Sequence, residues 1–190
     1  MRIRAATGSL VFAAALAGCA SANTGAGTGQ LDPTTSRPPP SEQSQLYSAA
    51  LHYLVLVDHP YATAPTRMGS VHFVDGPASR SAQLVIAPDG PPFDTGLKSE
   101  ITAQSADLPP LEFVSGSELH ADPTPQGFAG VAGDGVIISM SPGLRQDDGT
   151  IHVGAGLWCG IDCGLGLTYV LEQIDGQWTV TGTTGPVFIS

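Results

Sequence analysis

Two turns near the C-terminus independently predict one strand register, and their agreement constrains the fold more than any other feature of the sequence. The first turn is the dipeptide Asp175-Gly176, which lies between two alternating segments and is a strong hairpin signal. A two-residue turn at this point pairs Ile174 with Gln177. In the same register, Leu171 pairs with Val180.

The second turn lies between Cys159 and Cys163. Pairing these cysteines places Leu157 opposite Leu165, and the residues beyond them follow the same alternation. Both turns therefore put one set of apolar side chains on a single face of an antiparallel sheet. The set consists of Ile151, Val153, Leu157, Leu165, Leu167, Tyr169, Leu171, Trp178 and Val180.

An amphipathic helix is predicted over residues 41–58, because apolar residues recur there at i, i+4, i+7, i+8 and i+11. Ser41 can cap its first turn, and Pro60 prevents its continuation. The apolar face consists of Leu46, Ala50, Tyr53, Leu54 and Val57.

The middle of the chain predicts shorter elements. We expect strands over 70–75 and 82–87 joined through Asp75-Gly76-Pro77, a second helix over 95–106, a strand over 111–114 and a long loop over 115–134. A strand that carries Val136, Ile138 and Met140 then joins the C-terminal hairpins in a four-stranded meander.

These elements predict the α+β class, with one or two helices packed on a curved antiparallel sheet that ends in a C-terminal β-meander. The arrangement resembles the cystatin and NTF2-like helix-on-sheet folds. The ending from Gly176 to Val180 and up to Ser190 is similar to the tails of secreted bacterial domains of unknown function. Because such folds host many activities, the resemblance implies no catalytic residue.

Residues 1–18 have the layout of a secretory signal peptide. Arg2 and Arg4 precede an apolar segment that is too short to span a membrane. The sequence Leu16-Ala17-Gly18-Cys19 resembles the lipobox of bacterial lipoproteins, whose cysteine is acylated and becomes the new N-terminus. The resemblance implies a lipidated Cys19 and a location at the cell membrane or outer membrane, on the extracytoplasmic side.

Residues 19–40 are mostly small and polar and end in three prolines. A segment of this composition cannot bury enough apolar surface to offset its conformational entropy. We therefore expect a disordered tether over 19–40 and a single domain over 41–190.

The charge balance excludes some partners. Lys and Arg number 7 against 17 Asp and Glu, a formal net charge of -10, and loss of Arg2 and Arg4 with the signal peptide makes the chain more acidic still. Nucleic acid and anionic headgroups are bound chiefly through basic clusters, which this sequence lacks. We expect contact with the membrane through the lipid anchor, no nucleic-acid partner, and a protein or a neutral or cationic ligand as the binding partner.

Cys159 and Cys163 remain after lipidation of Cys19, and in an exported protein we expect them to form a disulfide. The alternative is a metal-binding CxxxC, which resembles the copper site of Sco-type assembly proteins. Those proteins carry proline after the second cysteine, on a strand-to-helix loop. Here Gly164 follows, between two strands, which favours the disulfide.

Histidines provide a second candidate site. His120 and Asp122 form an H-x-D in the predicted loop and, with His72 or Asp75 as a third ligand, could hold zinc. The spacing lacks the density of a motif such as HExxH, so loop polarity is the alternative explanation and we expect no bound metal or cofactor.

His52 and His59 are two helical turns apart, about 10 Å along the axis, which is too far for them to share a metal. We expect both to be solvated. No serine lies in a G-x-S-x-G or S-x-x-K motif, so the sequence selects no nucleophile.

The outer face of the C-terminal sheet is the third candidate. Its register turns Trp158 outward on a strip rich in glycine, and glycine within strands often marks close approach of a ligand or another backbone. The alternative is that the indole covers its own glycines. We expect a binding site on this strip, at Trp158, His152, Gly156 and Gly166.

Two functions follow from these observations. The first is a non-catalytic binding or interaction domain that a lipid anchor displays outside the cytoplasmic membrane. The alternative is a secreted metal-assisted hydrolase that uses His120 and Asp122.

Overall fold

Helix α1 (Glu42–Leu56) is the first element among the residues that the structure describes. The computed structural model describes residues 39–59, 68–78, 88–115, 121–123, 129–131, 134–160 and 163–189. The side chain of Ser41 caps α1 as predicted, because its Oγ accepts a hydrogen bond from the N–H of Ser44 at 3.3 Å.

The buried face of α1 is wider than predicted. Leu46 and Leu54 are buried as expected, but Tyr47 and Leu51 are fully buried as well. The helix contacts both the sheet and the second helix, α2 (Thr95–Gln104), so two adjacent stripes of α1 are covered. Val57 is exposed, contrary to the prediction, because it lies past the last turn at the C-cap.

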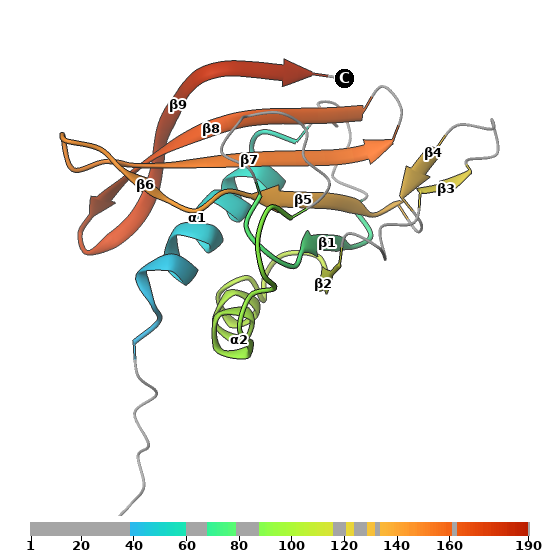
Figure 1. Cartoon of the computed structure of the whole chain (residues 1–190), viewed down its shortest axis with the longest axis horizontal. Coiled ribbons are helices and arrows are strands. Elements are labelled where there is room, and N and C mark those ends of the chain that lie inside the picture. Colours follow the sequence, from blue (N-terminus) through green and yellow to red (C-terminus); the bar gives the residue numbers. More distant parts are fainter. Residues whose placement is uncertain are drawn as a thin grey trace, which may run out of the picture. The chain divides into compact units, whose positions relative to one another are not determined.

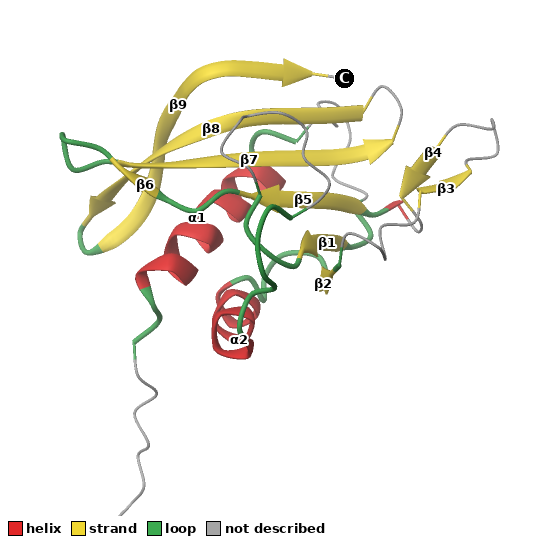
Figure 2. Ribbon diagram, in the orientation of Figure 1, coloured by secondary structure: helices red, strands yellow, loops and turns green. Residues whose placement is uncertain are grey.

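Nine strands of the described residues form one mixed sheet (Figures 1 and 2). Two helices accompany this sheet, which confirms the predicted α+β class. The strands are β1 (Val71–Val74), β2 (Leu111–Val114), β3 (Ala121–Pro123), β4 (Ala129–Val131), β5 (Val136–Met140), β6 (Leu144–Arg145), β7 (Ile151–Gly160), β8 (Cys163–Ile174) and β9 (Gln177–Ile189).

The predicted meander is present in β5, β7, β8 and β9, which pair antiparallel in that order. Leu157 pairs with Leu165 and Ile174 pairs with Gln177, so both turns give the predicted register. The predicted apolar face packs against α1 and belongs to the core. Its buried members are Ile151, Val153, Leu157, Leu167, Tyr169 and Leu171, and its half-buried members are Leu165, Trp178 and Val180.

Strand β1 departs from the antiparallel prediction. It pairs in parallel with both β2 and β5, so this part of the sheet is parallel and the whole sheet is mixed. The chain passes from β1 to β2 through α2, and a crossover through a helix returns a strand in the same direction. The predicted strand over 82–87 lies outside the described residues.

The predicted long loop over 115–134 contains two short strands. β3 and β4 pair antiparallel, and Gly130 of β4 pairs with Gly160 at the end of β7. Three-residue strands are too short to produce an alternation that the sequence reveals.

An aromatic cluster joins α1 to the parallel part of the sheet. Tyr47 of α1, Phe73 of β1, Phe113 of β2 and Phe93 ahead of α2 form ring pairs with centroids 5.5 to 6.5 Å apart. Such tilted and edge-to-face pairs add to the stabilisation from burial of apolar surface. The cluster fixes α1 and the segment that leads into α2 against one side of the sheet.

Candidate ligand-binding site

The outer strip predicted from the sequence lies on the face of the sheet away from α1. Trp158 pairs with Ile137 on one side and Gly164 on the other, and Gly156 pairs with Gly166. Trp158 is half-buried and both glycines of the pair are buried. The structure thus brings three of the predicted strip residues together.

Access to this strip is limited on one side, since Ile137 and Ser139 of β5 are both 4% exposed. His152 lies at the other end of β7, about 20 Å from Trp158 along the strand, so one small ligand cannot contact both. Binding at the strip is thus the sequence-based alternative to the pocket described below, and a loss of binding in Trp158→Ala would favour the strip.

Cys159 and Cys163 form the predicted disulfide, with Cα atoms 5.2 Å apart. The bond joins β7 to β8 beside an irregularity in their pairing, where the register shifts between Trp158 and Gly160. A disulfide leaves no thiolate for a metal, so this geometry disfavours the copper alternative.

Alkylation of the native mature protein is expected to label neither Cys159 nor Cys163, because the two thiols are joined. After reduction, both should react. Intact mass with and without reductant measures the difference. Labelling of either thiol in the unreduced protein would show that the pair is open and would restore the metal alternative.

Asp75, one predicted third zinc ligand, is occupied by structural contacts. Its Oδ1 accepts a hydrogen bond from the N–H of Phe93 at 3.0 Å, and its Oδ2 accepts one from Nζ of Lys98 at 2.7 Å. The carboxylate therefore ties the end of β1 to α2.

His72, the other predicted third ligand, lies between a hydroxyl and a carboxylate. Its Nε2 is 3.1 Å from Oγ of Ser70, and its Nδ1 is 3.6 Å from Oε2 of Glu112. The order of groups is that of a serine-hydrolase triad, but 3.6 Å is too long for a hydrogen bond and the Glu112 side chain is 70% exposed. The carboxylate thus does not orient the ring as a triad requires.

His120 lies outside the described residues, and Asp122 is in β3, of whose side chains nothing is described. Within the described residues no group of three or more His, Cys, Asp or Glu is placed to hold a metal. The zinc interpretation therefore gains no ligand from the part of the chain that the structure describes.

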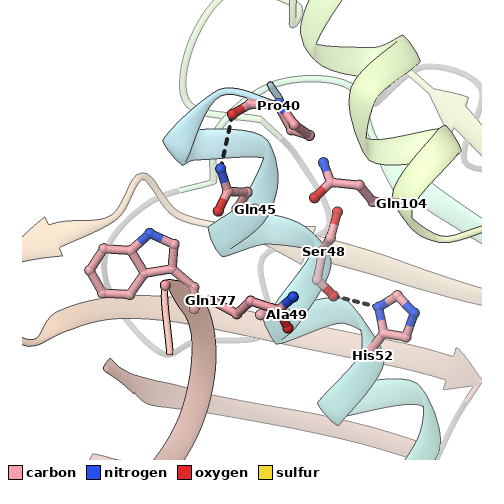
Figure 3. Close-up of a pocket in the computed structure, with 9 residues that line it drawn as sticks. Pro40, Gln45, Ser48, Ala49, His52, Gln104 and Gln177 are labelled. Atoms are coloured by element: carbon pink, nitrogen blue, oxygen red, sulfur yellow. Dashed lines mark hydrogen bonds between the residues drawn. The ribbon is translucent and has the colours of Figure 1, made fainter. Parts of the chain in front are cut away.

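A cavity of about 430 Å³, which we term the α1 pocket, lies over one stripe of α1 (Figure 3). Its volume is in the range of about 300–1,000 Å³ that is typical of small-molecule sites. Its floor has the spacing i, i+3, i+4 and i+7 of a single helix side. The floor residues are Gln45, Ser48, Ala49 and His52, and the walls are Pro40, Gln104 at the end of α2, and Gly176, Gln177 and Trp178 at the β8–β9 turn.

Ser48 is the most informative residue of the pocket. It is 5% exposed, and its Oγ is buried without a hydrogen-bond partner among the described residues. Figure 3 shows Ser48 between Gln45, Gln104 and His52. Buried hydroxyls are almost always hydrogen-bonded, so an unpaired one at a cavity indicates a place for a ligand or water group.

His52 is fixed by two acceptors and is not simply solvated, which corrects the prediction. Its Nδ1 is 2.7 Å from the carbonyl oxygen of Ser48, and its Nε2 is 2.9 Å from Oδ1 of Asp107. Both ring nitrogens therefore lie against oxygen atoms of the protein, and neither faces solvent alone. His59, beyond the end of α1, is half-buried.

The hydrogen bond from His52 lowers the pKa of Asp107. A lowered pKa in the folded state means that the carboxylate contributes stability above its unfolded-state pKa and loses it as the pH falls through the folded value. His52→Ala is therefore expected to raise the pKa of Asp107 toward the ordinary value of an aspartate, as measured by NMR titration of the carboxyl carbon.

Asp148 provides an internal control for this titration. Hydrogen bonds from Thr150 lower its pKa, so it should not respond to the loss of His52. A pKa of Asp107 that does not change in His52→Ala would contradict the bridge between the two side chains.

Trp178 forms the apolar wall of the pocket, and Arg145 holds it in place. The guanidinium carbon of Arg145 lies 5.9 Å from the centroid of the indole ring, within the range of a cation–π contact. The same guanidinium pairs with Glu42 at 2.7 Å, which links β6 to the first turn of α1. Trp178 itself is half-buried against the core.

Comparisons of the chain with protein-family models, curated proteins and solved structures found no match. The class of this protein is therefore given by its structure alone. It is an α+β domain with a polar pocket on helix α1. Neither α1 nor α2, the helices of the described residues, is long and apolar enough to cross a membrane.

Proposed function

We propose that this protein is a lipoprotein of the cell envelope, anchored through Cys19, whose domain binds a ligand in the α1 pocket without transforming it. The observation that carries the binding role is the buried, unpaired hydroxyl of Ser48. An unsatisfied buried polar group costs about 1–3 kcal/mol, and a ligand that pairs with it removes this cost. A polar ligand that reaches this hydroxyl would therefore gain binding free energy from it.

Two observations support export. The sequence Leu16-Ala17-Gly18-Cys19 resembles a lipobox, and the disulfide between Cys159 and Cys163 is typical of an oxidising compartment. The tether would enter the domain beside the pocket, because Pro40 is one of the pocket's wall residues.

Binding without catalysis is favoured by the chemistry of the lining. Among the described residues that line the pocket, His52 has the one side chain of the kind most often used for general acid–base catalysis, and both of its ring nitrogens are engaged. A general acid or base must exchange a proton with the substrate, which an imidazole held by two acceptors cannot do. The remaining lining groups can orient a ligand but cannot activate it.

The test uses the full lipoprotein in micelles of a detergent without a sugar headgroup. A library of charged, neutral polar and apolar small molecules is screened by NMR for shifts of the side-chain amides of Gln45, Gln104 and Gln177. We expect at least one compound class to shift these signals and to be recovered chemically unchanged. Turnover of the bound compound would contradict the non-catalytic role, and the absence of any shift would contradict the binding role.

A further inference from the structure

The charge of the α1 pocket narrows the class of ligand, if the pocket is the binding site as proposed above. Among the described residues that line it there is no Asp, Glu, Lys or Arg. The charged groups that contact lining side chains are already paired, Asp107 with His52 and Arg145 with Glu42. An ionic ligand would lose its hydration and meet only charges that already have partners, which is unfavourable.

The amide groups of the pocket have fixed orientations. Nε2 of Gln45 donates to the carbonyl oxygen of Pro40 at 2.9 Å, and Nε2 of Gln104 donates to Oγ of Ser44 at 2.9 Å. Because a carbonyl oxygen only accepts, the Gln45 amide cannot be reversed. The Gln104 amide is fixed in the same way, since its Nε2 also contacts the carbonyl oxygen of Glu100 at 3.2 Å.

These orientations leave the amide oxygens to accept hydrogen bonds from a ligand. The hydroxyl of Ser48 can both donate and accept, and Gln177 at the rim adds a further amide. The pocket therefore favours a ligand with several neutral groups that donate and accept at once. Hydroxyl groups have this property.

The indole of Trp178 adds a flat apolar surface to this polar set. The guanidinium of Arg145 lies over the ring and fixes its position, so little conformational entropy is lost when a ligand packs against the rest of the indole surface. A ligand that fits has one apolar face and a polar periphery. The pyranose ring of a sugar has C–H groups on its faces and hydroxyls at its edge.

We infer that the α1 pocket binds a neutral carbohydrate, through hydrogen bonds to Gln45, Ser48 and Gln104 and packing of a sugar ring on Trp178. The cavity volume of about 430 Å³ accommodates a small saccharide. The ligand is either a diffusible sugar or one unit of a larger glycan, since both present the same chemistry.

The two tryptophans of the chain make a matched test. Trp178 borders the α1 pocket, whereas Trp158 lies on the opposite face of the sheet. Maltose, cellobiose, lactose and chitobiose are titrated into the full lipoprotein, in micelles of a detergent without a sugar headgroup, and binding is followed by the side-chain amide signals of the glutamines. We expect one or more of these disaccharides to shift Gln45 and Gln104.

Trp178→Ala is expected to weaken the binding of that disaccharide about tenfold or more, in line with the loss of a central aromatic contact. Trp158→Ala should leave the affinity unchanged. Ser48→Ala, which removes the unpaired hydroxyl and leaves the helix intact, is expected to weaken binding as well. This second variant keeps the test valid if Trp178→Ala fails to fold.

Co-sedimentation with amylose, cellulose and chitin distinguishes the two sources. Binding to a disaccharide alone assigns a diffusible sugar, and binding to the polymer too assigns a glycan.

If Trp158→Ala abolishes binding and Trp178→Ala does not, the outer strip is the site and the inference is overturned. If charged or apolar compounds shift the glutamine signals but no sugar does, the carbohydrate class is wrong while the proposed function stands. If no compound of any class does so, both fail.

Discussion

Replacing Phe73 by alanine is expected to lower the free energy of unfolding by about 3–5 kcal/mol, a large part of the net stability of an ordinary domain. Phe73 is fully buried and lies on β1, between β2 and β5. Its ring contacts those of Tyr47, Phe93 and Phe113, so truncation leaves a cavity where both helices meet the sheet. Urea unfolding followed by circular dichroism measures the change.

Phe188→Ala is the matched control, because it removes the same side chain from a position that is 40% exposed near the end of β9. It should change the free energy of unfolding by about 0.5 kcal/mol or less. Equal losses for Phe73→Ala and Phe188→Ala would show that the aromatic cluster is not the part of the core that holds the helices.

Cys19→Ala is expected to abolish lipidation completely and to leave a precursor that retains residues 1–18. In the proposed lipoprotein the acyl chain would be attached through the thiol of Cys19, so no other side chain at this position could replace it. Metabolic labelling with an alkyne fatty acid and mass spectrometry of the N-terminal peptide measure the two effects.

Cys159→Ala is the control, since it changes a cysteine of the disulfide and leaves the anchor sequence intact. It should incorporate the fatty acid as the unaltered protein does. An unmodified N-terminus downstream of Cys19 in the unaltered protein would contradict the anchor and leave secretion without a lipid.

The C-terminal register could be predicted because it depends on local geometry. A two-residue turn at Asp175-Gly176 permits one pairing, and strand alternation then assigns each side chain to a face. The disulfide followed from the same register, with Cys159 and Cys163 as near neighbours across a short connection.

The parallel pairing of β1 was missed although the sequence contained a signal. A helix was predicted between the strands over 70–75 and 111–114, and a strand, helix and strand in succession is the pattern of a parallel crossover. The partner of β1 on its other side, β5, could not be read from the sequence, because no local rule connects residues so far apart.

The α1 pocket was missed for a different reason. Gln45, Ser48 and His52 recur on one side of the predicted helix, but polar residues with this spacing ordinarily face solvent. This side of α1 becomes the floor of a pocket because Gln104 and the β8–β9 turn lie on either side of it. That approach is a tertiary contact, and the hydroxyl of Ser48 has no signature in the sequence.

Helix α1, at the start of the domain, packs on β9, at its end. Tyr169 of β8 also donates a hydrogen bond to Asp58, 111 residues earlier in the chain, at 3.0 Å. The apolar face of α1 is therefore covered in full only after the last strand has been made, whereas the C-terminal hairpins can pair as soon as they emerge. If the chain is exported N-terminus first, as proposed, the core could be completed only when its last strand arrives.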